Sequence, residues 1–322
     1  MRHGVIAATG LLAVLAFAAA LLLPWSSLLA LYAANADLGV SFLVELRLPR
    51  AALALVYGAM LGAAGAAIQA LFGNPLASPD LTGTTSGAAL GAVVTAYIIG
   101  AASSFAMAIG AVFGALASLL LLIGLAGRRA ETATLLLAGL AISALAGALT
   151  TLALALAPSP FAFYDAYSWL MGSLIDRSLP QLGFAAVPAF VAILWLARLA
   201  PALDRLALGE EVADSLGHDL GRLRLQVICL SALGVGACVA ICGAIGFIGL
   251  VAPIFARRLT GGHAGRAILP AALIGALLLS LADLASRFAP LGRTLPIGVV
   301  TALVGAPFFL WLVARMRWGI AR

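Results

Sequence analysis

The segment Gly243-Ala-Ile-Gly-Phe-Ile-Gly-Leu-Val-Ala-Pro253 carries no charge, contains three glycines in eleven residues, and is followed by Arg257-Arg258. A helix needs roughly 20 apolar residues to cross the hydrocarbon core of a bilayer. The apolar stretch from 245 to 258 is shorter than that. Backbone that leaves the helical conformation at membrane depth is tolerated only against other protein or a water-filled cavity. The segment therefore predicts a short, partly broken span inside a bundle of membrane helices.

The composition of the whole chain agrees with a membrane location. Apolar residues make up 64% of the 322 residues and charged residues 9%, too few polar groups to cover a water-soluble globule. Only helical bundles and closed barrels cross lipid, and the long apolar runs favour helices. We predict an all-α, polytopic membrane protein with one transmembrane domain over residues 1–322 and about ten spans. These are residues 5–33, 48–71, 83–100, 104–126, 131–157, 182–200, 224–242, 245–258, 268–287 and 296–314.

The placement of the basic residues predicts the topology. All eighteen are arginines, and short cytoplasmic loops of membrane proteins carry an excess of positive charge. With ten spans and a cytoplasmic N-terminus, thirteen of them fall on the cytoplasmic side. The five on the outer side are Arg47, Arg50, Arg177, Arg287 and Arg293. Both termini are therefore predicted to be cytoplasmic, and the net charge of +6 reflects topology instead of nucleic-acid binding.

Several kinds of chemistry lack their usual residues. The chain has no lysine, which a Walker A loop needs on the nucleotide phosphates, so any ATP must be hydrolysed by another subunit. The histidines His3, His218 and His263 are far apart in sequence, and we predict no bound metal or other cofactor. Asp283 is the most prominent ionisable residue within a span. An ion pair with Arg287, four residues on, is favoured there over a proton relay.

Glycines four residues apart recur in three predicted spans. Small residues at this spacing let two helices approach closely. Packing within one subunit is favoured over a dimer seam as their role. The pairs are Gly58 and Gly62, Gly87 and Gly91, and Gly110 and Gly114.

The segment from about 201 to 223 is unusually polar for a connection between two apolar spans. It is also long, because helix connections commonly take two to eight residues. Residues Glu211 to Leu216 suit a short amphipathic helix that Gly217 ends. A solvated loop is the alternative, but the length favours a helix that docks a cytoplasmic partner.

Four motifs together resemble one known family. They are Arg47-Leu-Pro-Arg50, Asn74-Pro-Leu-Ala77, the Gly243–Pro253 segment and Leu295–Phe309. From about residue 45 to 315 the chain resembles the permease subunit of bacterial ABC importers for ferric siderophores, haem and cobalamin, the FecCD/BtuC type. One departure is Ile254, where many relatives have a histidine.

The resemblance implies a transport protein that performs no chemistry on its cargo. It implies the bacterial cytoplasmic (inner) membrane, a second permease chain in a homodimer, two cytoplasmic ATPase subunits that use the ATP, and a periplasmic or surface substrate-binding protein. The expected cargo is a metal chelate, first of all a ferric siderophore; haem, cobalamin and, less so, molybdate are alternatives. An ion-coupled secondary carrier or a membrane enzyme is disfavoured, because each would need more ionisable side chains within the spans.

The resemblance also implies a docking site for the binding protein on the outer side. It assigns this role to Arg47, Arg50 and Arg287. Two arginines where the chain re-enters the membrane are not explained by the charge rule for topology. An anchor on lipid headgroups is the alternative for Arg47 and Arg50.

On the inner side the resemblance implies a gate and a coupling site. The gate would close Asn74 and Leu76 against Thr132 and Ala133; a plain turn is the alternative at Asn74, because Pro75 stops the helix. The coupling site for the ATPase would comprise Glu210, Glu211, Ala213, Asp214, Leu216 and Gly217.

Overall fold

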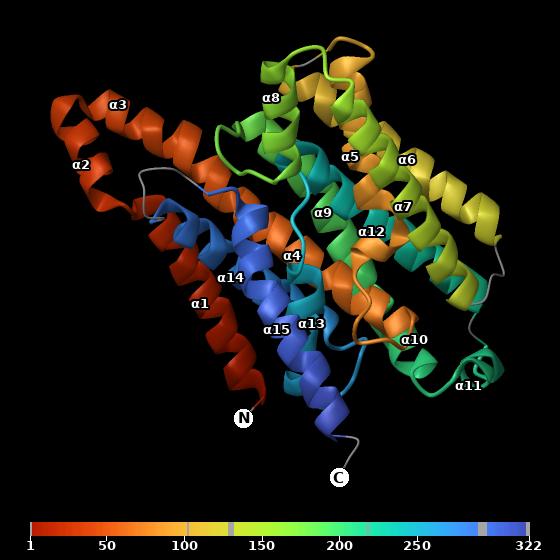
Figure 1. Cartoon of the computed structure of the whole chain (residues 1–322). Coiled ribbons are helices and arrows are strands. Elements are labelled where there is room, and N and C mark those ends of the chain that lie inside the picture. The colour runs from red at the N-terminus through yellow and green to blue at the C-terminus, as the bar shows by residue number, and fades with distance from the viewer. Residues whose placement is uncertain (1, 102, 128–131, 218, 289–294, 320–322) are drawn as a thin grey trace.

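A computed structural model describes residues 2–101, 103–127, 132–217, 219–288 and 295–319, and these residues form a bundle of helices without strands (Figure 1). The prediction of an all-α membrane fold is confirmed. In chain order the elements are α1 (Arg2–Leu22), α2 (Trp25–Ala34), α3 (Ala36–Ser41), η1 (Phe42–Arg47), α4 (Leu48–Leu71), η2 (Pro79–Thr82), α5 (Thr84–Tyr97), α6 (Ser104–Ala126), α7 (Thr132–Ala155), α8 (Pro160–Leu170), α9 (Leu179–Arg198), α10 (Ala200–Leu206), α11 (Glu210–Ser215), α12 (Leu220–Cys242), α13 (Ile248–Leu259), α14 (Ile268–Arg287) and α15 (Ile297–Gly319).

Each predicted span coincides with a helix, although their lengths differ. Within the described residues, seven helices are long and apolar enough to cross a membrane, and one of them is the continuous helix from Ala36 to Leu71. Two others are short, with 14 residues in α5 and 12 in α13. The predicted spans therefore include helices that are too short to cross a bilayer core by themselves.

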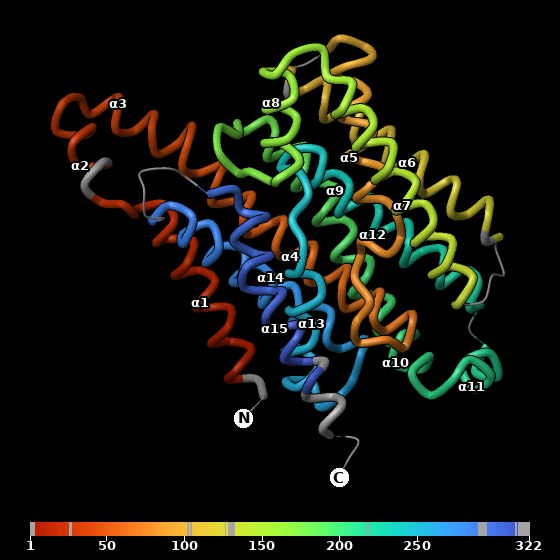
Figure 2. The backbone as a smooth tube through the Cα atoms, viewed as in Figure 1, coloured from red at the N-terminus to blue at the C-terminus, as the bar shows by residue number. Residues whose placement is uncertain are grey.

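The predicted first span, 5–33, is wrong beyond Leu22. The helix ends there because Pro24 has no N–H to donate and restricts the residue before it. The chain resumes as α2, which packs against α3. Gly39 lies so close to Tyr32 that a Cβ on it would be 2.7 Å from the ring. Figure 2 shows this α2–α3 hairpin projecting from the bundle at the end away from α11.

α4 runs through the bundle and is buried along most of its length. It meets α14 at a glycine seam. A Cβ on Gly58 would lie 2.3 Å from the carbonyl oxygen of Gly275, and one on Gly62 would lie 2.0 Å from that of Ala271. Only glycine lets the two backbones come this close. The predicted packing of this glycine pair within one subunit is confirmed.

A second glycine seam joins α5 to α6. A Cβ on Gly91 would lie 2.1 Å from the carbonyl oxygen of Gly110, and one on Gly114 would lie 2.0 Å from that of Gly87. These four glycines come from the other two predicted pairs. Both pairs therefore pack against each other inside the subunit.

The Gly243–Pro253 segment forms the short, broken span that its composition predicts. The backbone leaves α12 at Gly243, which has a φ of 74°, and helix α13 begins only at Ile248. The first turn of α13 packs directly on α4, because a Cβ on Gly65 would lie 1.9 Å from the carbonyl oxygen of Gly249. The interrupted backbone from 243 to 247 therefore lies beside a helix that is fixed on α4, and part of it lines a cavity described below.

The two ends of the bundle carry different elements (Figure 1). α10 and α11 lie at one end, which we call the α11 end, and α1 begins and α15 ends there as well. The α2–α3 hairpin and α8 lie at the opposite end, which we call the α8 end. The candidate sites described below fall at these two ends.

Candidate functional site

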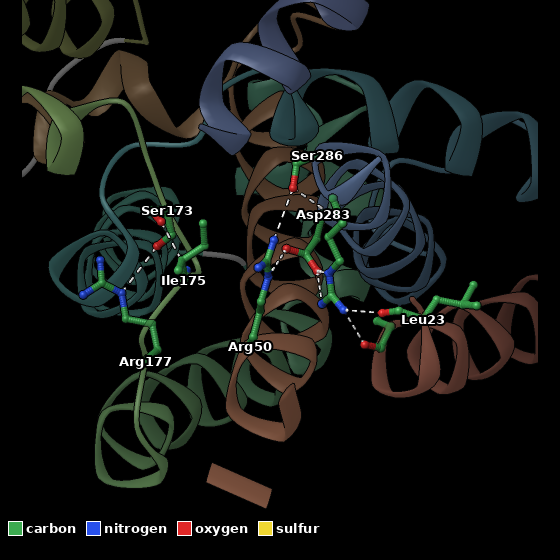
Figure 3. A network of polar contacts seen from close by, with 9 residues as sticks. Leu23, Arg50, Ser173, Ile175, Arg177, Asp283 and Ser286 are labelled. Atoms are coloured by element: carbon green, nitrogen blue, oxygen red, sulfur yellow. Dashed lines mark hydrogen bonds and ion pairs between the residues drawn. The ribbon is translucent and has the colours of Figure 1, made fainter. Parts of the chain in front are cut away.

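A buried carboxylate joins α14 to α4 towards the α8 end. Asp283 has no exposed surface, and its Oδ1 accepts a 2.7 Å hydrogen bond from Nε of Arg50. Its Oδ2 accepts from Nε of Arg287 at 3.1 Å and also from Nη2 of that residue. Arg50 donates a further bond to Ser286 Oγ at 3.3 Å (Figure 3). The predicted Asp283–Arg287 pair is confirmed, as part of a larger set that we call the Asp283 network (Arg50, Asp283, Ser286 and Arg287).

Two arginines bind carbonyl groups at the end of α1 and just beyond it. Arg47 donates to the carbonyl oxygens of Leu21 at 2.8 Å and Pro24 at 2.9 Å. Arg287 donates to that of Leu23 at 3.2 Å. The last four carbonyls of a helix have no partner within the helix, and a cation near them is favourable. The arginines therefore fasten the end of α1 to α4 and α14.

The three arginines predicted to dock a binding protein lie close together but are mostly buried. Arg47 is 5% exposed, and the side chains of Arg50 and Arg287 are 14% and 7% exposed. Their guanidinium groups donate to groups of this same chain. The carbonyl groups at the end of α1 and the carboxylate of Asp283 hold them inward. A role in docking stays a prediction.

Other charged groups line the surface near these arginines. A cavity of about 420 Å³ lies between η1 and the α8–α9 connection, and Glu45, Asp176 and Arg177 line it. Arg177 donates to the carbonyl oxygen of Ser173 at 3.4 Å and points away from Arg50 in Figure 3. The sequence analysis singled out neither carboxylate, because nothing in the pattern brings η1 beside that connection.

The predicted turn after α4 is confirmed. Oδ1 of Asn74 accepts a 2.9 Å hydrogen bond from the backbone N–H of Leu76. The gate that would close this turn on α7 stays a prediction. Ala133 is exposed, and the side chain of Thr132 lies outside the described residues. Among the hydrogen bonds of the described residues, none joins Asn74 or Leu76 to Ala133.

Beyond this turn the chain folds back among the helices. The short element η2 packs against α7, α5 and α12, and Ser143 of α7 donates to the carbonyl oxygen of Asp80 at 3.2 Å. Burial raises the pKa of the Asp80 carboxyl, against the opposite effect of the Thr85 and Ser78 side chains. The sequence analysis missed this carboxylate, because a residue between two spans is expected to lie outside the bundle.

The predicted amphipathic helix of the polar connection is confirmed as α11. It ends before Gly217, whose φ of 81° suits glycine. Ala213 is fully buried and holds one face of α11 against the protein. Glu210 forms a 2.5 Å ion pair with Arg224 of α12. α11 is therefore a fixed projection, not a free loop.

The other face of α11 is exposed. Val212 of α11 is 43% exposed, and so are Leu208 just before the helix and Leu216 at its C-cap, at 67% and 56%. The carboxylates of Glu211 and Asp214 are exposed beside them. Exposed apolar side chains in and on both sides of a short helix, with charges next to them, suit a docking surface for another protein.

A cavity of about 580 Å³ lies between α15, the end of α8 and the non-helical connection from α12 to α13. Phe247 stands at its edge with a φ of 67° and packs against Gly305, on which a Cβ would lie 2.4 Å from the phenylalanine side chain. The sequence analysis did not single out Phe247. The lining is entirely apolar in side-chain chemistry and comprises Leu170, Met171, Ala244, Gly246, Phe247, Gly298, Val299, Ala302, Leu303, Ala306 and Pro307.

The sequence profile of the FecCD transport family matches residues 5–315, nearly the whole chain. The chain belongs to this family. Among its curated relatives, the vitamin B12 import system permease protein BtuC of Vibrio cholerae is 44% identical over 282 residues, which cover 84% of this chain and 82% of that protein. The protein of the same name in Salmonella typhi is 40% identical over 86% of this chain and 85% of its own length.

Solved structures agree with the sequence comparison. One solved structure is described as an inward-facing conformation of a metal-chelate type ABC transporter. It matches with a TM-score of 0.84 and 30% sequence identity, and the match covers 97% of this chain and 99% of that chain. PsaBC from Streptococcus pneumoniae in complex with Fab has a TM-score of 0.55 at 20% identity, which shows a shared fold. This FecCD family protein is thus an ABC importer permease, a multi-pass membrane protein and a transport component instead of an enzyme.

Proposed function

We propose that this FecCD family permease imports cobalamin. The observation that carries the proposal is the 40–44% identity, over 84–86% of the chain, to permeases of vitamin B12 import systems. The ferric siderophore that the sequence analysis placed first is not confirmed, and the cobalamin alternative has the better support. Siderophore import remains the second candidate, because the matched structure at 30% identity is assigned to the metal-chelate type.

The pathway, we propose, lies between two copies of the chain. The cavity beside α15 and the α12–α13 connection supplies an apolar wall without side chains that would coordinate a metal, which suits a cargo whose metal is already enclosed by its own ligand. Next to the cavity, α15 leaves Leu303 and Val304 66% and 70% exposed. We place the second copy against this exposed apolar face, which continues the cavity wall and which lipid would otherwise cover. The homodimer itself is what the family resemblance implies.

At the α11 end we propose that a separate ATPase docks on the exposed face of α11. The apolar side chains of Leu208, Val212 and Leu216 would be its contact, with Glu211 and Asp214 at the rim. This assignment places the α11 end, and with it both chain ends, in the cytoplasm. It agrees with the arginine distribution, because most predicted cytoplasmic arginines belong to connections at that end.

We propose that the binding protein docks on exposed charged side chains at the surface of the α8 end. Arg47, Arg50 and Arg287 would support this surface from beneath, because their guanidinium groups are already engaged within the chain. The exposed charged residues there would include Glu45 and Asp176, beside the half-buried Arg177. Charges at the edge of an interface mainly set orientation and association rate.

Growth of a cobalamin-dependent bacterium tests the cargo. A strain that lacks its own vitamin B12 permease would receive this chain together with the ATPase and binding protein encoded beside it. We expect growth at nanomolar cobalamin to be restored, while iron-limited growth of a siderophore-permease mutant is not. The reverse result would favour the siderophore. Growth on cobalamin without the ATPase would contradict the proposed mechanism.

A further inference from the structure

A carboxylate at the α11 end joins two connections that are far apart in the sequence. Asp204 of α10 accepts a 2.8 Å hydrogen bond through Oδ1 from the backbone N–H of Gly265, in the connection between α13 and α14. Its Oδ2 lies 3.7 Å from Nε of Arg266, and its Oδ1 lies 4.0 Å from Nδ1 of His263. The Asp204 side chain is 18% exposed. A carboxylate that accepts from a backbone N–H makes a stronger bond than a neutral acceptor.

Close backbone contact supports this joint. A Cβ on Gly265 would lie 2.0 Å from the carbonyl oxygen of Ala200, the first residue of α10. Next to it Ala267 and Leu203 are completely buried. The connection of α13 to α14 therefore lies directly on α10, and Asp204 fixes its position.

The connection that Asp204 binds joins α13 to α14, and these two helices pack closely on α4. We call α4, α13 and α14 the three-helix block. α13 packs on α4 where Gly65 meets Gly249, and α14 packs on α4 where Gly62 meets Ala271. The Asp283 network ties α4 to α14 again towards the α8 end. We infer from these contacts and from the buried Asp283 network that α4, α13 and α14 move as one unit. Phe247, at the edge of the cavity, precedes the first residue of α13 and will move with them.

α10, the helix that carries Asp204, is followed in the chain by α11. Only residues 207–209 separate α10 from α11, and Leu208 and Gly209 donate backbone hydrogen bonds to the carbonyls of Arg205 and Leu206. A displacement of α11 will therefore also displace α10. α10 packs on α4, and Asp204 adds a hydrogen bond from α10 to the connection that joins α13 to α14.

We propose that Asp204 is the positioning residue that transmits movement of α11 to the block of α4, α13 and α14, and so to the cavity wall at Phe247. The proposal rests on the proposed docking of an ATPase at α11. It does not depend on the identity of the cargo. Arg266 and His263 are exposed supports, at 71% and 50% of their side chains, and contribute less than the Gly265 bond.

The test measures movement of the cavity wall directly. In a background where Cys229, Cys238 and Cys242 are replaced by alanine, Ala302→Cys places one thiol in the cavity lining. The chain is reconstituted in lipid with its ATPase, and the rate of maleimide labelling is compared without nucleotide and with ATP plus vanadate. We expect nucleotide to change this rate. ATP hydrolysis and the amount of bound ATPase are measured in the same samples.

Asp204→Ala should reduce the nucleotide-dependent change in labelling by about tenfold, within the usual range for coupling between sites, while the ATPase stays bound and active. Asp204→Asn keeps an acceptor for the Gly265 N–H and should retain most of the change. The matched control is Asp219→Ala. Asp219 also accepts a backbone bond, from Arg222 at 2.9 Å, but within its own helix, so its loss should cost stability without loss of coupling.

Three outcomes separate the possibilities. Loss of the labelling change in Asp204→Ala, with its retention in Asp204→Asn and Asp219→Ala, supports the proposal. An unchanged response in Asp204→Ala overturns it, and so does an equal loss in Asp219→Ala, because Asp204 would then be structural only. If the unmodified chain neither binds the ATPase nor responds to nucleotide, the proposed docking at α11 has failed, and the inference falls with it.

Discussion

The ion pairs at the two ends of the bundle differ in how deeply their carboxylates are buried. Towards the α8 end, Asp283 is completely buried between Arg50 and Arg287. At the α11 end, Glu210 is 52% exposed in its pair with Arg224. A buried charge that loses its partner is costly, whereas an exposed pair contributes little to stability. The first arrangement suits a permanent joint between helices, and the second suits a surface that must shift when a partner moves.

Deletion of the buried carboxylate should have the largest effect. Asp283→Ala leaves the guanidinium groups of Arg50 and Arg287 buried without a counter-charge, and we expect a loss of about 3–5 kcal/mol in the free energy of unfolding. The control Glu210→Ala should cost less, because the Glu210 carboxylate is half exposed and only one guanidinium, that of Arg224, loses a partner. Unfolding of both variants in mild detergent, followed by circular dichroism, measures the difference. Equal losses of unfolding free energy in Asp283→Ala and Glu210→Ala would contradict the proposed difference between the two ends.

The glycine seam of the three-helix block should be nearly as sensitive. In Gly62→Ala the new Cβ would meet the carbonyl oxygen of Ala271, and we expect a loss of roughly 1–3 kcal/mol. Gly147→Ala in α7 is the matched control, because a Cβ there meets nothing within 4 Å. It should stabilise the helix by up to about 1 kcal/mol. A thermal midpoint that rises in both variants would show that the helices can separate freely.

Changes on α11 should leave stability nearly intact and affect coupling instead. Glu211 is exposed, and Gly217 has a positive φ that alanine adopts only with strain. In the double variant Glu211→Ala, Gly217→Ala we expect transport per ATP hydrolysed to fall about tenfold. The ratio of uptake to phosphate release in proteoliposomes measures this. An unaltered ratio would count against α11 as the docking helix.

Asp80 should give the smallest effect, with a characteristic pH dependence. Burial raises the pKa of its carboxyl, so the folded protein bears the cost of the charged form above that pKa. Asp80→Asn should therefore raise the thermal midpoint at neutral pH. Its advantage should shrink as pH falls through the raised pKa and vanish below about 3.9, the usual value for aspartate in an unfolded chain. A midpoint difference that is constant with pH would contradict this explanation.

The sequence predicted those features that depend on local pattern. Apolar runs located the helices, and the polar segment before Gly217 located α11. This was possible because residues close together in the sequence determine where a helix begins and ends. The i,i+4 spacing predicted the pair of Asp283 with Arg287. Even the glycine pairs predicted close packing, although not which helices would meet.

Features that depend on how distant segments meet could not be predicted this way. The sequence placed Arg47 at the outer edge of a span, but not against the carbonyls of Leu21 and Pro24, 26 and 23 residues away. Asp80 and Asp204 stand in connections, where a carboxylate is usually solvated. Their contacts with α7 and with the α13–α14 connection arise only from the tertiary fold.

Uptake into proteoliposomes tests the central claim, an ATP-driven importer of cobalamin, most directly. This chain would be reconstituted with the ATPase and binding protein encoded beside it, and labelled cyanocobalamin and a ferric siderophore would be offered in parallel. The account predicts accumulation of cyanocobalamin that requires ATP and both partner proteins, with little siderophore inside. Accumulation of the siderophore alone, or uptake of either compound without the ATPase, would contradict it.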